Sequence, residues 1–337
     1  MLDNASTDGT GEIIRRYAAK DPRVAALRNE VNHVYEEGNS WVEIISGYDD
    51  SDYLCFLDAD DEYKPEFLAE TQRFLWDYDL DVAACGYEFI DESTKNVFAV
   101  RKLEQDLIID TPEKFSDYFP AYYLFIRTAW CKLYKLSVLR KFDLSRISGL
   151  STFGMDTLFA IESFRNANRA GILAKSLHKY HVSPQSASYG LDDTRVICDR
   201  TLDGAARAFL MEKCGQISPW NHKNLQRAFY FGTIDTIIVL IKSDLPPKEK
   251  LANLCNLLTN AKTRELFQQI DIPDEQLDFE LRDPIFKWLL QQKEYRNLDS
   301  VETIVEILTS IYPRLSPLKR KEALKRLLLE SPDKFLE

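Results

Sequence analysis

Two patterns of apolar and polar positions divide the chain near residue 191. Before that point, short apolar runs alternate with stretches that carry one apolar face, and beyond it amphipathic stretches follow each other almost without interruption. Alternating strand-like and helix-like segments are typical of an α/β sheet, whereas the later pattern is typical of packed helices. We therefore expect an α/β domain over residues 1–191 and an α-helical C-terminal domain over residues 192–337.

The clearest strand candidates in the first part are short apolar runs. Residues 54–57 are all apolar, as expected of a strand that is covered on both faces. Residues 81–90 predict a second strand and residues 97–100 a hairpin partner for it, while residues 24–27 predict a shorter strand. Gly86 lies inside the second strand, where glycine permits the close approach of a ligand or of another strand.

Amphipathic segments with recognisable ends predict the helices. Residues 12–20 carry an apolar face and stop at an Asp-Pro pair, and Pro65 stands near the first turn of another helix. No repeat period is convincing among the later segments. The predicted helices cover residues 12–20, 41–48, 64 onward, about 156–166, 201–214, 221–243, 248–259, 262–270, 283–292, 301–311 and 317–329.

Three carboxylates crowd together directly after the first apolar run, at Asp58, Asp60 and Asp61. Ligands bind at the carboxyl ends of strands in open α/β sheets. Like charges at this spacing repel each other unless a cation or hydrogen-bond donors compensate them. A solvated turn, a calcium loop and a metal–nucleotide site could all use such a cluster. A calcium loop requires Gly at its sixth position and Glu at its twelfth, where this chain has Tyr63 and Ala69.

Composition narrows the class of protein. The chain has 337 residues, 45% apolar and 29% charged, as in soluble globular proteins, and a net charge of −11. This charge argues against nucleic acid and anionic membranes as partners held by bulk attraction. The six cysteines contain no Cys-x-x-Cys pair, so we expect reduced thiols and a cytoplasmic location. The apolar run at residues 237–241 is far too short to span a bilayer.

The segment Phe-Leu-Asp-Ala-Asp-Asp at residues 56–61 resembles the aspartate motif of family 2 glycosyltransferases, which have the GT-A fold, a Rossmann-like α/β sheet. Further segments match the same family: the opening residues 3–10, the Trp-x-Lys-Leu-Tyr block at residues 130–134, and Gly-Met-Asp-x-x-Phe at residues 154–159. Residues 178–188 resemble the close of the family's catalytic domain. The resemblance covers the chain up to about residue 191 and implies nucleotide-sugar chemistry.

The resemblance implies roles for individual residues. Asp3 would contact the base or ribose of the donor nucleotide, with a helix-capping turn as the alternative for this segment. Asp58 would bind ribose or metal, Asp60 would bind Mn²⁺ or Mg²⁺, and Asp61 would assist. Asp156 would be the catalytic base, with an N-cap aspartate as the alternative. The remaining expected site residues are Ser6 and Asp8 beside the donor, Trp130 on the acceptor side or simply in the core, and His181 or Lys179 on the phosphates.

The chain also departs from the family pattern. Met155 replaces the usual Glu beside the base, and Glu37 and Gly38 stand where an Ala-Arg pair is expected. The family's first strand, the helix after it and most of the second strand have no counterpart, as in a truncated gene model or a true deletion. A sheet without that strand would expose an edge, which puts the activity of this chain in doubt.

These features predict an inverting, metal-dependent glycosyltransferase that uses a UDP-linked sugar and a carbohydrate or glycoconjugate acceptor, in cell-surface polysaccharide or glycoconjugate synthesis. One alternative is a catalytically impaired module that binds a partner. Another is a phosphatase with Asp58 as nucleophile, which Asp61-Glu62 after Asp60 disfavours. The basic last helix, at residues 317–329, suits the inner face of the membrane or an acidic partner, although a solvated face is the simpler explanation.

Overall fold

A computed structural model describes residues 1–31, 40–150, 153–183, 190–192 and 194–273, together with seven isolated residues between 276 and 291. The segment around Glu37 and Gly38, residues 184–189, most of the predicted helix at residues 283–292 and both later predicted helices, including the basic one, lie outside the described residues.

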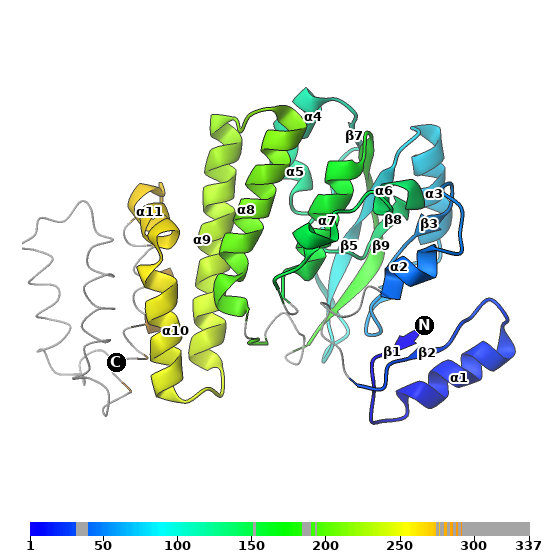
Figure 1. Cartoon of the computed structure of the whole chain (residues 1–337), viewed down its shortest axis with the longest axis horizontal. Helices are drawn as coiled ribbons and strands as arrows, with labels where there is room; N and C mark the ends of the chain where they lie inside the picture. Colours follow the sequence, from blue (N-terminus) through cyan, green and yellow to red (C-terminus); the bar gives the residue numbers. More distant parts are fainter. Residues whose placement is uncertain are drawn as a thin grey trace, which may run out of the picture.

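A mixed sheet of seven strands forms the centre of the described part (Figure 1). Its main path runs β3-β8-β5-β9-β4, with β6 paired to β5 and β7 paired to β9. Only β5 and β9 are parallel to each other, and all the other pairs are antiparallel. The strands are β3 (Tyr53–Leu54), β4 (Glu62–Tyr63), β5 (Val82–Asp91), β6 (Val97–Arg101), β7 (Leu107–Ile109), β8 (Lys132–Lys135) and β9 (Ala170–Val182).

Helices cover both faces of this sheet because side chains alternate along its central strand. Val82 and Ala84 of β5 belong to the cluster packed against α7, and Ala83 and Cys85 to the cluster packed against α3. The helices up to this point are α1 (Thr10–Lys20), α2 (Ser40–Ile45), α3 (Phe67–Asp77), α4 (Pro112–Asp117), α5 (Phe119–Tyr122), α6 (Leu136–Leu139) and α7 (Met155–Asn166), with a 3₁₀ turn η1 (Leu144–Ile147).

Four further helices follow, as the amphipathic pattern predicts: α8 (Arg195–Cys214), α9 (Pro219–Lys242), α10 (Pro247–Thr259) and α11 (Ala261–Gln269). Figure 1 shows them stacked side by side beyond α7. None of the described helices is both long enough and apolar enough to cross a membrane.

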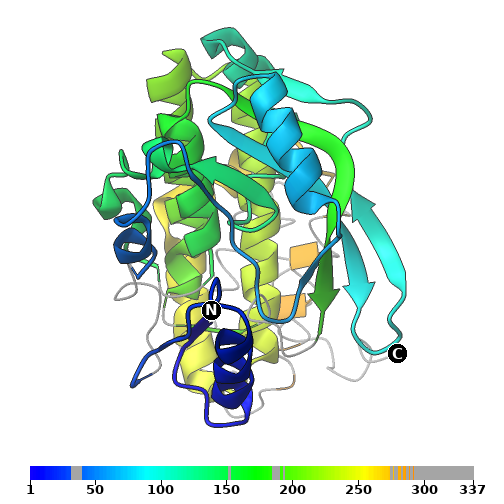
Figure 2. The same cartoon turned by 90° about the vertical axis from the view of Figure 1, so that its right-hand side faces the viewer.

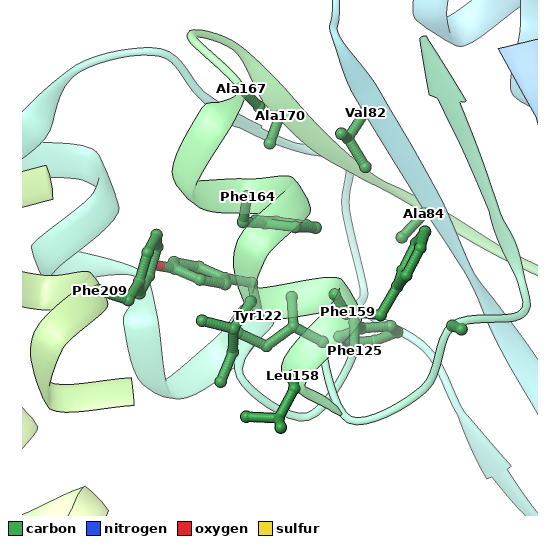
Figure 3. Close-up of a cluster of buried hydrophobic side chains, with 14 of the residues drawn as sticks. Val82, Ala84, Tyr122, Phe125, Leu158, Phe159, Phe164, Ala167, Ala170 and Phe209 are labelled. Atoms are coloured by element: carbon green, nitrogen blue, oxygen red, sulfur yellow. The ribbon is translucent and has the colours of Figure 1, made fainter. Parts of the chain in front are cut away.

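The apolar core continues from the sheet into the helical part. The Phe209 ring of α8 meets that of Phe115 edge-on at a centroid distance of 6.2 Å. The Tyr122 ring stacks on Phe164 of α7, and all four residues are buried in one cluster (Figure 3). The predicted boundary at residue 191 therefore marks a change of secondary structure within a shared core, and the division into two domains stays a prediction.

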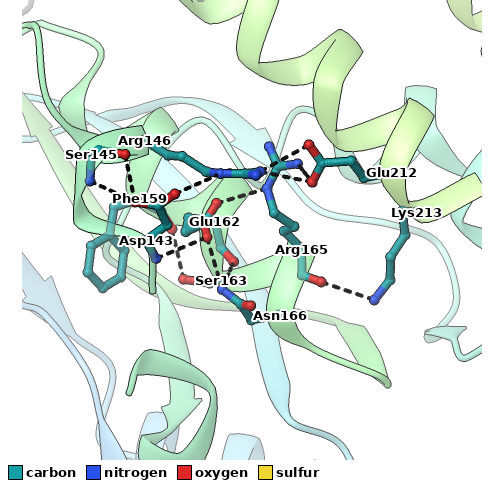
Figure 4. A network of polar contacts seen from close by, with 10 residues as sticks. All are labelled: Asp143, Ser145, Arg146, Phe159, Glu162, Ser163, Arg165, Asn166, Glu212 and Lys213. Atoms are coloured by element: carbon teal, nitrogen blue, oxygen red, sulfur yellow. Dashed lines mark hydrogen bonds and ion pairs between the residues drawn. The ribbon is translucent and has the colours of Figure 1, made fainter. Parts of the chain in front are cut away.

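A polar network ties the end of α7 to α8 (Figure 4). The Arg165 guanidinium donates to Glu162 at 2.8 Å and also pairs with Glu212, which in turn pairs with Arg146 at 2.8 Å. Lys213 donates to backbone carbonyl groups at the end of α7. The charges are mutually compensated, so we assign this network to structure.

Gly86 occupies a close approach between strands, as predicted. A Cβ atom placed there would lie 2.5 Å from the Arg101 carbonyl oxygen and 3.0 Å from that of Lys175. The register between β5 and β9 also shifts at this residue. Residues 97–100 form the predicted hairpin partner as part of β6.

The prediction of a strand covered on both faces over residues 54–57 was wrong. The strand β3 has two residues, both partly buried, and Leu57 is 49% exposed. Among the described residues β3 pairs only with β8, so it is an edge strand and one side of it has no neighbour.

The N-terminal strands form a separate unit. β1 (Leu2–Asp3) and β2 (Leu27–Arg28) pair in parallel as a two-stranded sheet, and α1 connects them. Figures 1 and 2 both show this unit apart from the large sheet. No backbone ladder joins the two sheets within the part of the chain that the structure describes.

Candidate active site

The three clustered aspartates lie on the turn between β3 and β4, which we call the aspartate turn (residues 58–61). Each offers a carboxylate oxygen, and these oxygens lie within 4.8 Å of one another. The Asp61 N–H group donates to the Asp58 carbonyl at 3.1 Å, which closes the turn. Asp58 and Asp60 are exposed, whereas Asp61 is buried.

Asp58 of the aspartate turn has a raised pKa. Burial of its carboxyl, followed by repulsion from Asp156, Asp61 and Asp60, raises its pKa from the ordinary 3.8 to about 7. The residue is still exposed on the surface, so a ligand can reach it. Asp156 lies near enough to contribute to this rise in pKa. Excess negative charge and oxygen-only donors suit a hard divalent cation, and Asp58 and Asp60 are the open ligands for it.

Asp61 is placed differently from its neighbours. Its side chain has no exposed surface, and one carboxylate oxygen lies 2.9 Å from Nε2 of His178. The other accepts the backbone N–H of His181 at 2.9 Å. Both oxygens are thus already bound to β9, and its expected assistance to a metal stays a prediction.

Asp156 lies in the first turn of α7, one residue after Met155. The N-cap is Gly154, whose φ of 91° suits glycine, so the alternative of an N-cap aspartate was wrong. Burial raises the pKa of Asp156, and the Ala129 backbone and the Lys132 ammonium group oppose the change. A raised pKa brings a carboxylate closer to the pH at which a general base works.

Sequence reasoning missed Lys132 as a member of this cluster. Lys132 is 1% exposed, and its Nζ donates to the carbonyl oxygens of Thr128 at 2.7 Å and Trp130 at 3.0 Å. Burial lowers its pKa to about 8, against the attraction of neighbours that include Asp156. A lysine inside the apolar strand block at residues 130–134 was the available signal.

The Trp130 indole is largely buried, at 5% exposure, beside the aspartate turn. It stacks on His178 with ring centroids 4.4 Å apart and meets the Tyr87 ring edge-on at 4.7 Å. These contacts describe a packed core residue, and contact with an acceptor stays a prediction.

The two basic residues expected on the phosphates both lie beside carboxylates. Lys179 pairs with Glu62 at 2.8 Å, and Nδ1 of His181 lies 2.7 Å from Glu92. Nε2 of His181 lies 3.6 Å from Glu62. Phosphate binding by either residue would require it to exchange these partners.

The expected donor residues near the N-terminus form their own turn. Buried Asp3 accepts the Ser6 N–H at 2.8 Å and pairs with Arg28 at 2.5 Å, and these contacts lower its pKa. Asp8 accepts the Thr10 N–H at 2.9 Å at the start of α1. These hydrogen bonds lie inside the N-terminal unit, and contact of Asp3, Ser6 or Asp8 with a donor nucleotide stays a prediction.

Comparison with known proteins gives a family match for the first part of the chain. Residues 1–142, which include the aspartate turn, match the family model described as glycosyl transferase family 2. Over these residues the chain is similar to that family. The carboxylate cluster after a strand lies inside the matched part.

Two curated relatives that are named glycosyltransferases match little more than half of the chain. The glycosyltransferase YibD of Escherichia coli (strain K12) is 26% identical over 56% of this chain and 54% of its own length. EpsJ of Bacillus subtilis (strain 168), also named a glycosyltransferase, is 23% identical over 55% of this chain and 53% of its own length. The chain thus spans about half the length of the curated relatives that it matches.

Among solved structures, Staphylococcus aureus TarS 1–349 in complex with UDP-GlcNAc has a TM-score of 0.42 at 16% identity, covering 99% of this chain and 79% of that one. This likeness is too distant to assign a donor to the chain.

Proposed function

We propose that the chain is an inverting, metal-dependent glycosyltransferase. It would move a sugar from a nucleotide-diphosphate donor, with UDP as the nucleotide, to a hydroxyl group of a carbohydrate or glycoconjugate acceptor. The observation that carries the proposal is the carboxylate cluster: the aspartate turn supplies a cation site, and Asp156 lies close enough to raise the pKa of Asp58. Cell-surface polysaccharide or glycoconjugate synthesis and a cytoplasmic location remain predictions from the sequence.

In the proposed reaction, Asp156 accepts the proton of the acceptor hydroxyl at a carboxylate oxygen. The acceptor oxygen then bonds to the anomeric carbon while the bond from that carbon to the diphosphate breaks. Attack from the face opposite the diphosphate inverts the anomeric centre and requires no carboxylate nucleophile, by the same logic as in inverting glycosidases. A divalent cation held by Asp58 and Asp60 would neutralise charge on the departing diphosphate as a Lewis acid.

Burial of Asp156 supports its role as base. A carboxylate that is poorly solvated takes up a proton more readily, and its raised pKa reflects this. The Lys132 ammonium group nearby opposes this rise in pKa and so favours the ionised carboxylate, the form that a base requires.

A second candidate is a catalytically impaired binding module. It is favoured by one observation, that the N-terminal unit with Asp3 forms its own two-stranded sheet rather than joining the large one. A donor nucleotide that needs both parts would then find only the part around the aspartate turn.

Turnover of UDP-sugars separates the two candidates. The chain is incubated with Mn²⁺, a panel of UDP-sugars and simple carbohydrate acceptors, and released UDP is measured. The proposal predicts UDP release that requires Mn²⁺ and is lost in Asp60→Asn. If the folded chain binds UDP with none of the donors turning over, the binding module is the better account.

A further inference from the structure

The Asp61 carboxylate is the buried anchor of the aspartate turn. Both of its oxygens are taken up by β9, one by His178 and the other by the His181 N–H. A buried carboxylate is costly to the fold unless it is hydrogen-bonded in this way. Asp58 and Asp60 differ, since they remain exposed and available to a ligand.

His178 is itself held firmly in place. Its side chain has no exposed surface, and its ring lies almost parallel to the Trp130 indole, at 8°. The Tyr63 ring meets it edge-on at a centroid distance of 5.3 Å. Rings packed on these sides prevent the imidazole from turning away, so its Nε2 stays 2.9 Å from Asp61.

The hydrogen bonding also indicates which nitrogen carries the proton. An ionised carboxylate only accepts hydrogen bonds, so Nε2 of His178 donates to Asp61. Nδ1 of His178 is buried and has no hydrogen-bond partner among the described residues. A neutral ring with its proton on Nε2 therefore leaves no buried donor unsatisfied, whereas a second proton on Nδ1 would.

The backbone carries this fixed position into the turn. β4 begins one residue after Asp61 and pairs with β9, so that Tyr63 lies opposite His178. On the other side, the Asp61 N–H donates to the Asp58 carbonyl. The relative positions of the Asp58 and Asp60 carboxylates thus depend on where Asp61 is held.

We infer that His178 is a positioning residue, which holds the aspartate turn in its cation-binding shape through Asp61. The inference rests on the proposed function, because it concerns the cation site used there. It assigns Asp61 the role of an anchor in that site, while Asp58 and Asp60 supply the ligand oxygens.

Matched substitutions test the inference. His178→Phe keeps a ring against Trp130 but removes the donor, and His178→Gln keeps an N–H donor of similar reach. His222→Gln, at an exposed histidine of α9, is the control. Binding of Mn²⁺ in the presence of UDP is followed by electron paramagnetic resonance of the free ion, with circular dichroism to verify folding.

We expect His178→Phe to weaken Mn²⁺ binding by about 10- to 100-fold, the usual effect of removing a group that orients a metal ligand. His178→Gln should restore most of the binding, and His222→Gln should match the wild type. If His178→Phe does not fold, His178→Asn replaces it, because its shorter amide does not reach Asp61.

A double-mutant cycle with Asp61→Ala, which removes both hydrogen bonds of the carboxylate, tests whether His178 acts through Asp61. Loss of the anchor already frees the turn, so adding His178→Phe should weaken Mn²⁺ binding no further. Full additivity, or wild-type binding by folded His178→Phe, overturns the inference alone. Failure of the wild-type chain to bind Mn²⁺ with UDP overturns the proposed function, and the inference with it.

Discussion

Asp156 and Asp60 both belong to the proposed active site, but substitution should separate their tasks. Asp156→Asn preserves the shape of the side chain and removes its ability to accept a proton. General base catalysis contributes about 10²–10⁴-fold, so turnover should fall by that factor while UDP affinity stays close to that of the wild type. Steady-state UDP release and calorimetry measure the two quantities.

Asp60→Asn should instead weaken metal-dependent UDP binding as well as turnover. Asp271→Asn is a matched control, since the Asp271 side chain is 78% exposed and pairs only with Lys223 among the described residues. Near-wild-type turnover in Asp156→Asn would show that Asp156 is not the base.

The raised pKa of Asp58 predicts a pH dependence of stability. Between its ordinary pKa of 3.8 and its folded pKa of about 7, the folded chain binds a proton that the unfolded chain does not. The free energy of unfolding therefore decreases as pH rises through this interval, and the loss is complete above about pH 7. In EDTA, Asp58→Asn should not lose stability with rising pH in this way, so its melting temperature at high pH should be above that of the wild type.

Thermal denaturation at a series of pH values with EDTA checks this expectation. The difference in melting temperature between Asp58→Asn and the wild type should shrink as pH falls. Saturating Mn²⁺ should raise the melting temperature of the wild type only. A difference that does not change with pH would mean that Asp58 ionises as an ordinary surface aspartate.

The sequence revealed the candidate site residues unevenly, for a physical reason. Asp58, Asp60 and Asp61 are adjacent in the chain, so their cluster is visible in the sequence. The bond between Asp61 and His178 joins residues 117 positions apart, and only the pairing of β4 with β9 creates it. The apolar block around Lys132 signals its burial, but its position near Asp156 arises from packing between distant segments, which no local pattern encodes.

Among the described strands, Gly86 is the glycine that leaves the least room for a side chain. Gly86→Ala places a methyl group against backbone carbonyls that cannot move freely. Overpacking of this kind costs about 1–3 kcal/mol in the free energy of unfolding. Chemical denaturation measures the change.

The control for this substitution is Gly204→Ala on α8. No atom lies within 4 Å of a Cβ placed there, and Ala is favoured over Gly inside a helix by about 1 kcal/mol. The two Gly→Ala changes should therefore shift stability in opposite directions. A neutral or stabilising Gly86→Ala would contradict the close approach of β5 to its neighbours.

Helices were easier to predict than strands in this chain. The amphipathic period identified α8 to α11 to within a few residues at most ends, because each buries one face against a neighbour. The apolar run at residues 54–57 gave a wrong prediction because the burial of a strand depends on its neighbouring strands. Among the described residues, β3 has a neighbouring strand on one side only. Pairing partners distant in sequence leave no trace in a local pattern.

In the molecule as a whole, the continuous core predicts cooperative unfolding of sheet and helices. Phe209 on α8 is fully buried against the sheet-side cluster, so Phe209→Ala should cost about 3–5 kcal/mol. Glu212, also on α8, loses its ion pairs with Arg146 and Arg165 in Glu212→Gln. Because its side chain is 45% exposed, we expect the free energy of unfolding to fall by at most about 1 kcal/mol.

Unfolding followed by both near-UV and far-UV circular dichroism checks the cooperativity. Phe209→Ala should shift the transition of the sheet and that of the helices together. Two separate transitions, with only the helical one shifted, would show that residues on either side of 191 fold independently.

The most direct test of the proposed glycosyltransferase site is a calorimetric titration of UDP into the chain with Mn²⁺ and again with EDTA. The carboxylate cluster is too negative to receive a diphosphate without a cation. We therefore predict saturable binding with Mn²⁺ that is abolished by EDTA, weakened by Asp60→Asn and retained in Asp156→Asn. Equal UDP binding with and without the cation would contradict the account.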